Sequence, residues 1–285
     1  MTLGRRLGAE SEAKLFRALH RRAVDAPHPP ICWDSLDVSS LDETLRESLR
    51  ATWAARAVSE YRSLGVFAEM MGRLPEAGLA LDVHTGLSRL IADEARHTEH
   101  CLRLAEALGG ADDATVEGPS LRLVDTKLSP RLWLARWTLS MFCVGESASV
   151  GLLHAMRDAV EDPCIGAVIA GLLRDEAMHD RFGWALAETL VPALSDDERE
   201  WLGADLAYVF SHYDRMHAGA TGDVDALPTP PEIPGPGAAF GVVDAACFAR
   251  AWYTRVGEVI LPGLAALGVP AYEAWSLRRE LAAPA

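Results

Sequence analysis

The sequence has no uninterrupted apolar run of about 18 residues, the minimum length for a membrane-spanning helix. Its N-terminal end also carries no apolar segment of signal-peptide length. We therefore expect a protein that is not inserted in a membrane and that works in the cytoplasm.

Positive charge is scarce, because 27 Lys and Arg face 41 Asp and Glu, which gives a formal net charge of −14. A nucleic-acid-binding protein needs a basic surface to contact phosphates, and an anionic membrane surface attracts basic segments in the same way. The charge balance therefore argues against both kinds of partner.

Cysteine pairs are missing as well. The five cysteines are scattered and none forms a C-x-x-C pair. This pattern argues against a disulfide framework and a cysteine-ligated zinc site, and it fits reduced thiols in a cytoplasm. The cysteines are Cys32, Cys101, Cys143, Cys164 and Cys247.

Runs of β-branched residues are short, whereas Ala, Leu, Arg and Glu dominate, which predicts an all-α fold. An apolar content of 49% is sufficient for a buried core. Predicted helix starts include a capping box from Ser39 or Ser40 to Glu43, an Asp162-Pro163 start, and a second box from Ser195 to Glu198. The four long helices are expected at about residues 39–73, 76–108, 130–160 and 163–191.

Shorter elements flank these four helices. We expect accessory helices at about residues 11–24, 195–218 and 243–281, with a Gly- and Pro-rich loop at 219–237. Because one bundle core would unite the long helices, the prediction is a single domain over residues 1–285 with its core at about 40–192.

A five-residue motif, Asp-Glu-Ala-x-His, occurs twice, at residues 93–97 and 175–179. Each copy follows another glutamate by about one helical hairpin, since Glu60 precedes Glu94 by 34 residues and Glu146 precedes Glu176 by 30. The two halves therefore read as a repeat of helical hairpins.

On a helix, residues three apart share a face, so each motif presents its Glu and His together. These six residues lie on apolar stripes, where four unpaired carboxylates would be very costly to bury. Two divalent cations would balance four carboxylates, and mixed oxygen and nitrogen ligands suit iron or manganese better than structural zinc. Glu69 competes with Glu60 for the first position but lies on a more polar side of its helix.

The order Glu60, Glu94-Ala95-Arg96-His97, Glu146, Glu176-Ala177-Met178-His179 resembles that of the ferritin-like di-iron carboxylate proteins. The resemblance covers about residues 40–192. It implies a four-helix bundle with additional N- and C-terminal helices. It further implies one iron on Glu60, Glu94 and His97, a second on Glu146, Glu176 and His179, and at least one bridging Glu. Manganese or a mixed Mn/Fe pair is the alternative metal content.

The first motif also resembles the D-E-x-R-H motif of bacterial multicomponent monooxygenases. By that resemblance Asp93 and Asp175 would accept ring N–H bonds from the histidines and orient them, with Arg96 nearby. Met178 stands where such motifs often carry Arg, so a symmetric network is not implied. An equally supported alternative is that the two aspartates are solvated surface acids or form salt bridges to Arg96 or Arg174.

Two positions separate the branches of this family. Cys101 stands where the radical-generating reductase subunit has a tyrosine, and Leu172 stands where arylamine N-oxygenases have an extra histidine. The expectation is a stand-alone di-iron oxygenase or oxidase that uses O2 to hydroxylate, N-oxygenate or desaturate a small organic substrate. The alternative is a ferritin- or bacterioferritin-like ferroxidase or iron-handling protein.

A separate ferredoxin or reductase would deliver electrons, because no nucleotide-binding fingerprint is present. A homodimer is among the assemblies to be expected. The predicted pocket residues are Cys101, Phe142, Cys143 and His154.

Small residues near the motifs (Gly145, Ser149, Gly151 and Gly183) indicate either room for a substrate or close helix packing. A further group on the helix at 195–218 mixes helix faces, so a solvated helix is expected there rather than a second metal site. That group is Asp205, His212, Asp214 and His217.

Overall fold

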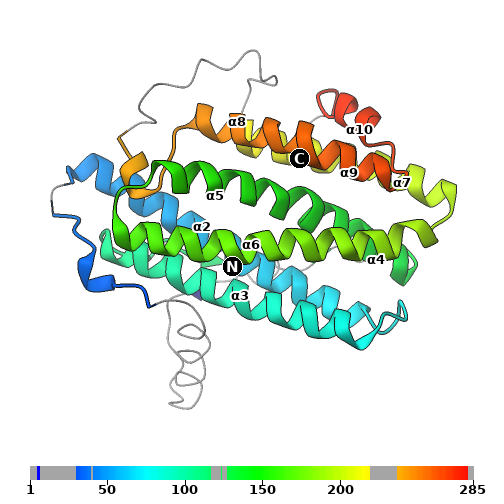
Figure 1. Ribbon diagram of the computed structural model, residues 1–285, viewed down its shortest axis with the longest axis horizontal. Coiled ribbons are helices and arrows are strands. Elements are labelled where there is room, and N and C mark those ends of the chain that lie inside the picture. Colours follow the sequence, from blue (N-terminus) through cyan, green and yellow to red (C-terminus); the bar gives the residue numbers. More distant parts are fainter. Residues whose placement is uncertain are drawn as a thin grey trace.

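The computed structural model describes residues 5–6, 30–39, 41–116, 123, 127–218 and 236–281. Four long helical segments lie side by side in it (Figure 1). They are α2 (Glu43–Arg73), α3 (Leu81–Ala107), the continuous segment formed by α4 (Pro130–Trp137), η3 (Thr138–Glu146) and α5 (Ser147–Ala159), and α6 (Pro163–Leu190).

The all-α prediction is confirmed for the described part of the chain. Its strands there are β1 (Arg5–Arg6) and β2 (Thr115–Val116), which pair antiparallel over two residues each. The helix expected at about 11–24 and most of the loop expected at 219–237 lie outside the described residues.

A second layer covers α5 and η3 on the upper side of the view (Figure 1). The region expected as a helix at 243–281 is divided into several segments in this layer. The layer consists of α7 (Asp196–Ala218), α8 (Ala245–Arg255), η7 (Val256–Ile260), α9 (Leu261–Ala266) and α10 (Ala271–Leu277). The remaining short helices are η1 (Trp33–Ser35), η4 (Val191–Ala193) and η6 (Ala238–Phe240).

Two of the predicted helix starts are confirmed. The Asp162 side chain accepts a hydrogen bond from the Ile165 backbone N–H at 2.8 Å, and Ser195 and Glu198 exchange the two bonds of a capping box. The start predicted at Ser39 or Ser40 is wrong, because Asp42 caps α2.

The start of α3 lies at Leu81, later than the predicted 76. A turn separates α2 from α3, and Gly78 adopts a φ of 71° in it. Glycine adopts this left-handed conformation without strain, and the turn that it forms prevents α2 from continuing.

The third long segment is not the uniform α-helix predicted over residues 130–160. Residues 138–146 form a π-helix, and Glu146 is its last residue. A π-helical turn places an extra residue in the turn, so it re-aims every side chain that follows. The direction in which Glu146 points is therefore set by η3.

The continuous segment of α4, η3 and α5, Pro130–Ala159, is long and apolar enough to cross a membrane by length and composition alone. However, 61% of its most apolar window is buried inside the protein. Burial of this extent is expected of a helix that packs in the core of the protein.

Close packing of η3 on α6 predicts a contrast between two glycines of α6. A Cβ at Gly183 would lie 2.0 Å from the Phe142 Cβ, whereas a Cβ at Gly171 would meet nothing within 4 Å. We expect Gly183→Ala to destabilise the metal-free protein by about 1–3 kcal/mol and Gly171→Ala to stabilise it by about 0.5–1 kcal/mol. Urea denaturation measures both, and equal effects would contradict this packing.

Candidate metal centre

The six residues singled out by the repeated motif come from four helical segments. Glu60 lies on α2, Glu94 and His97 on α3, Glu146 at the end of η3, and Glu176 and His179 on α6. None of the six is more than 7% exposed. The apolar stripes of the sequence therefore correctly predicted that these polar side chains face inward.

The six residues form two overlapping groups. The first is Glu60, Glu94, His97 and Glu176, and the second is Glu94, Glu146, Glu176 and His179. Within each group the ligand atoms lie within 4.8 Å of one another, so that each group could hold a metal ion. Glu94 and Glu176 belong to both groups and are therefore the residues placed to bridge two ions.

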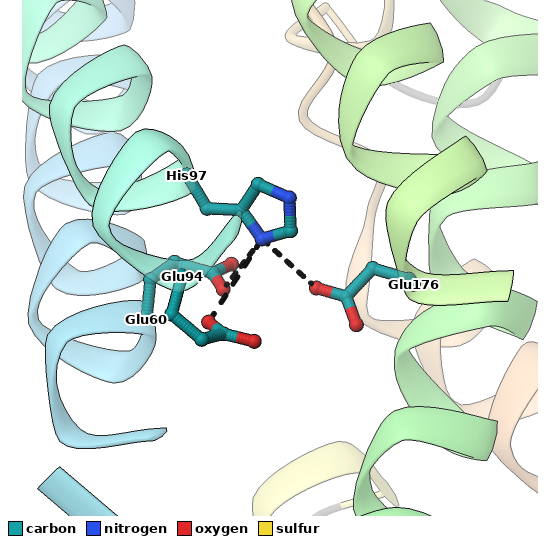
Figure 2. Close-up of side chains that lie close together, drawn as sticks. All are labelled: Glu60, Glu94, His97 and Glu176. Atoms are coloured by element: carbon teal, nitrogen blue, oxygen red, sulfur yellow. Dashed lines mark ion pairs between the residues drawn. The ribbon is translucent and has the colours of Figure 1, made fainter. Parts of the chain in front are cut away.

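In both histidines the Nδ1 atom faces the carboxylates. Figure 2 shows His97 from α3 pointing toward α6, with its Nδ1 at 3.6 Å from Glu60, 3.8 Å from Glu94 and 3.5 Å from Glu176. His179 repeats the arrangement, with its Nδ1 at 3.1 Å from Glu94, 3.5 Å from Glu176 and 4.0 Å from Glu146.

The Nε2 atoms point the other way, and each meets the aspartate of the opposite motif. His97 Nε2 lies 3.3 Å from Asp175 on α6, and His179 Nε2 lies 3.6 Å from Asp93 on α3. An Nε2–H directed at a carboxylate leaves the Nδ1 lone pair free for a metal. The aspartates thus favour the tautomer that a metal site requires.

Arg96 joins the two aspartates. Its Nη2 donates to Asp93 and, at 2.8 Å, to Asp175, and the three side chains are almost fully buried. Each aspartate therefore faces a histidine and also pairs with Arg96, and of the two ring contacts that of His97 with Asp175 is within hydrogen-bond distance. One arginine serves both motifs, which is why Met178 in the second copy leaves no gap.

The aspartates are ionised in this setting. Burial would raise the pKa of Asp93 and of Asp175, but the facing histidine and Arg96 lower it below its ordinary value in each case. The network therefore carries two negative charges and one buried positive charge, and the exposed Arg89 and Arg174 complete it.

The carboxylates and histidines of the cluster have strongly perturbed acidities. Burial raises the pKa of Glu94 to about 8, and burial together with repulsion by Glu176 raises that of Glu146 well above its ordinary value. Burial would lower the pKa of His97 and His179, but the surrounding carboxylates raise it well above the ordinary value.

Glu176 behaves in the opposite way. Burial would raise its pKa, but the neighbouring Glu146, His179 and His97 lower it well below its ordinary value. In the metal-free protein, protons thus occupy the places where cations could bind, and metal binding would have to release them.

Several buried atoms that face the centre of the cluster have no hydrogen-bond partner, although the large majority of buried polar side-chain atoms normally have one. A cation that accepts oxygen and nitrogen ligands would satisfy these atoms together. The donor set therefore fits a metal pair. The atoms are both Glu94 carboxylate oxygens, Glu176 Oε2, and Nδ1 of His97 and of His179.

The raised pKa of Glu94 predicts a pH dependence of stability. Its proton stabilises the folded, metal-free protein fully below the ordinary value of 4.5, and this contribution is lost as the pH rises through about 8. We expect the Tm of the metal-free protein to fall between about pH 5 and pH 9. In Glu94→Gln, which cannot titrate, the Tm should fall less, and an identical decline would contradict the assignment.

Arg56 is a site residue that the sequence motifs missed. It stands one helical turn before Glu60 on α2, and its Nε lies 3.1 Å from Glu60 Oε1. Its side chain is 14% exposed. The spacing of four residues that puts Arg56 on the same face as Glu60 was the only available signal.

The predicted pocket residues have different surroundings. Cys101 is fully buried, and the charges of Glu60 and Arg56 act on its thiol. Phe142 stacks on Phe67, whose ring edge meets His179 with centroids 6.2 Å apart. These two predicted residues therefore lie beside the cluster.

The other two predicted pocket residues lie elsewhere. Cys143 is buried, and the charges acting on its thiol are those of Asp180 and Glu188 rather than those of the cluster. His154 is exposed on α5, so the expectation that it approaches a buried pocket is corrected. Eight residues after Glu146, an α-helix has turned by about 80°, which directs His154 away from the site.

The glycines near the motifs are explained by close packing. A Cβ at Gly145 would lie 2.6 Å from the Tyr213 hydroxyl, and one at Gly151 would lie 2.4 Å from Arg255. Gly183 packs equally closely on Phe142, so that of the two explanations offered by the sequence, packing holds for these three. Ser149 remains partly exposed and faces Arg56.

Glu69, the alternative to Glu60 as the first ligand, is not part of the cluster. Its carboxylate accepts a hydrogen bond from the Leu123 backbone N–H.

The four polar residues of α7 do not gather into one site. Asp205 pairs with Arg136 at 2.9 Å, and Asp214 accepts hydrogen bonds from Trp252 and Arg278. The expectation of a solvated helix is wrong for Asp214, which is buried.

No protein-family model matches this chain, and no curated protein matches it either.

Proposed function

We propose that the chain is a ferritin-like di-iron protein that activates O2 to oxidise a small organic substrate. The observation that carries the proposal is the pair of overlapping ligand groups sharing Glu94 and Glu176. Two ions held by common carboxylates can act jointly on one small molecule, and carboxylate with imidazole suits iron, with manganese or a mixed pair as alternatives.

The proposed ligands are Glu60, Glu94 and His97 for one ion and Glu146, Glu176 and His179 for the other. The chemistry that bound iron would supply is the reduction of O2 and the oxidation of the substrate. The protein would hold both ions with fixed side chains, because Asp175 and Asp93 orient the imidazoles and Arg96 fixes both aspartates.

Apolar walls would keep water from the reacting groups. Phe67 and Phe142 are fully buried and stack with ring centroids 4.6 Å apart beside His179. Excluding water strengthens the electrostatic interactions inside the site and prevents the loss of oxidising power to solvent. This setting favours an oxygenase over a route for the passage of hydrated iron.

O2 consumption by the chemically reduced, iron-loaded protein tests the proposal. We expect uptake that is stimulated by one class in a panel of amines, fatty acids and aromatics, with oxidised product formed. The Glu94→Ala variant provides the matched control without the shared ligand. Rapid uptake with iron oxidation but no organic product would favour the iron-handling alternative.

The proposed function also implies an electron donor, a cellular location and an assembly. A ferredoxin or reductase would supply electrons, the chain would work in the cytoplasm, and a homodimer is the assembly to examine. Reconstitution with heterologous ferredoxin and reductase pairs would show whether turnover depends on such a donor.

A further inference from the structure

Arg56 is a cation beside the candidate metal centre. The carboxylates that act on its guanidinium are those of Glu60, Glu176 and Glu94, all of them members of the cluster. The closest is Glu60, at 3.1 Å from Nε. Without metal, the glutamates can therefore balance its charge.

The remaining donors of Arg56 are poorly satisfied. Its Nη1 lies 3.8 Å from the Met156 sulfur, which is a weak acceptor, and its Nη2 lies 3.4 Å from the Ser149 hydroxyl. The Nε atom makes no hydrogen bond of good geometry. A guanidinium has five N–H donors arranged for planar, two-point binding of an anion, so this one retains unused capacity.

Metal binding would remove the balancing charge. Two divalent ions would neutralise the four glutamates, including the three that act on Arg56. The neighbouring groups supply no replacement, since burial keeps the Cys101 thiol neutral by raising its pKa, and burial with nearby cations lowers the pKa of His217 to about 4. A largely buried cation without a counter-charge is unfavourable.

The side chains around Arg56 are not fully closed off from solvent. Ser149 on α5 and His217 on α7 are both partly exposed, and Arg56 itself is 14% exposed. An anion arriving there would find two kinds of donor, the guanidinium and the Ser149 hydroxyl, one helical turn from the Glu60 ligand.

We propose that Arg56 binds a carboxylate group of the substrate, so that the site acts on small organic acids. This inference rests on the proposed function, because it assumes that metal occupies the cluster. A carboxylate matches the guanidinium in shape and charge, and it would restore the local charge balance when the metals are bound. Ser149 would be the second donor to the same group.

Paired probes test this proposal without turnover. Protein loaded with Mn(II) is titrated calorimetrically with benzoate against benzamide and with octanoate against octanamide. Each pair differs mainly in the charge of one end. We expect at least one acid to bind about ten- to a hundredfold more tightly than its amide, as a charge-assisted hydrogen bond implies.

Variants at position 56 identify the residue responsible. Arg56→Gln should abolish the preference for the acid, while Arg56→Lys should retain part of it. Arg62→Gln, an exposed position on the same helix, is the matched control and should bind as the parent does. Circular dichroism and manganese content establish that each variant is folded and loaded.

The two proposals fail in distinguishable ways. Equal affinities within each pair, an acid preference that survives in Arg56→Gln, or no binding of any probe by manganese-loaded protein would overturn the carboxylate proposal alone. Failure to bind manganese or iron at all would overturn the proposed function as well.

Discussion

Alanine at Glu94 or at Glu176 is expected to abolish both metal positions, whereas alanine at Glu60 or at Glu146 should abolish only one. The reason is that Glu94 and Glu176 belong to both ligand groups and the other two glutamates to one each. Loss of a shared ligand should weaken binding more than about 100-fold, beyond the effect of an outer residue. Metal content after anaerobic Fe(II) loading and desalting measures the difference.

Glu69→Ala is the control for this series, because Glu69 lies on the same helix as Glu60 but outside the cluster. The metal-free Glu94→Ala protein should be at least as stable as the parent, since the substitution removes a fully buried carboxylate with two unpartnered oxygens. Equal metal loss in all four variants would contradict the sharing of Glu94 and Glu176.

Arg96→Met is expected to cost about 3–5 kcal/mol of folding free energy, because it leaves two buried carboxylates without their common partner. Asp93 and Asp175 are only 1% and 3% exposed, so solvent cannot replace the guanidinium. Metal affinity should also fall about 10- to 100-fold, since both histidines lose their fixed supports. Urea denaturation and calorimetric metal titration measure the two effects.

Arg89→Met provides the matched comparison. Arg89 also pairs with Asp93, at 3.2 Å, but its side chain is 55% exposed. Its loss should cost less than about 1 kcal/mol, as is usual for exposed ion pairs. If both arginine variants had the same small effect, the buried network would not support the site in the way described.

The inward orientation of the ligands could be predicted from the sequence because two independent patterns coincided. Glu60, Glu94, Glu146 and Glu176 interrupt apolar stripes at helical spacing, and a repeated motif relates the two halves. Four glutamates on apolar helix faces of one chain are difficult to explain unless their carboxylates share a cation site.

The π-helix in η3 could not be predicted from those patterns. Leu139, Phe142, Cys143 and Val144 are all fully buried, and Thr138 and Ser140 are buried beside them, so this stretch has no exposed polar stripe. An extra residue in a turn shifts the helical phase, but the shift leaves no trace in the sequence where no exposed polar stripe marks that phase. His154 was misplaced for a different reason, because the α-helix turns by about 80° over the eight residues that separate it from Glu146.

The pairing of each aspartate with the histidine of the other motif depends on tertiary structure and could not be predicted from the sequence. Asp93 adjoins Glu94 in sequence, yet its carboxylate faces His179 on α6, and Asp175 faces His97 on α3. Only the approach of two helices joins each aspartate to the opposite motif. Arg56 was missed for a simpler reason, because a single arginine on a helix is common and belongs to no motif.

X-ray diffraction at the iron absorption edge, from crystals of protein loaded with iron, would locate the metal ions directly. We expect two anomalous peaks about 3.5–4 Å apart, the usual separation in two-metal sites, between α2, α3, η3 and α6. Both peaks should contact Glu94 and Glu176. A single peak, or iron bound away from these two glutamates, would show that they do not bridge a metal pair.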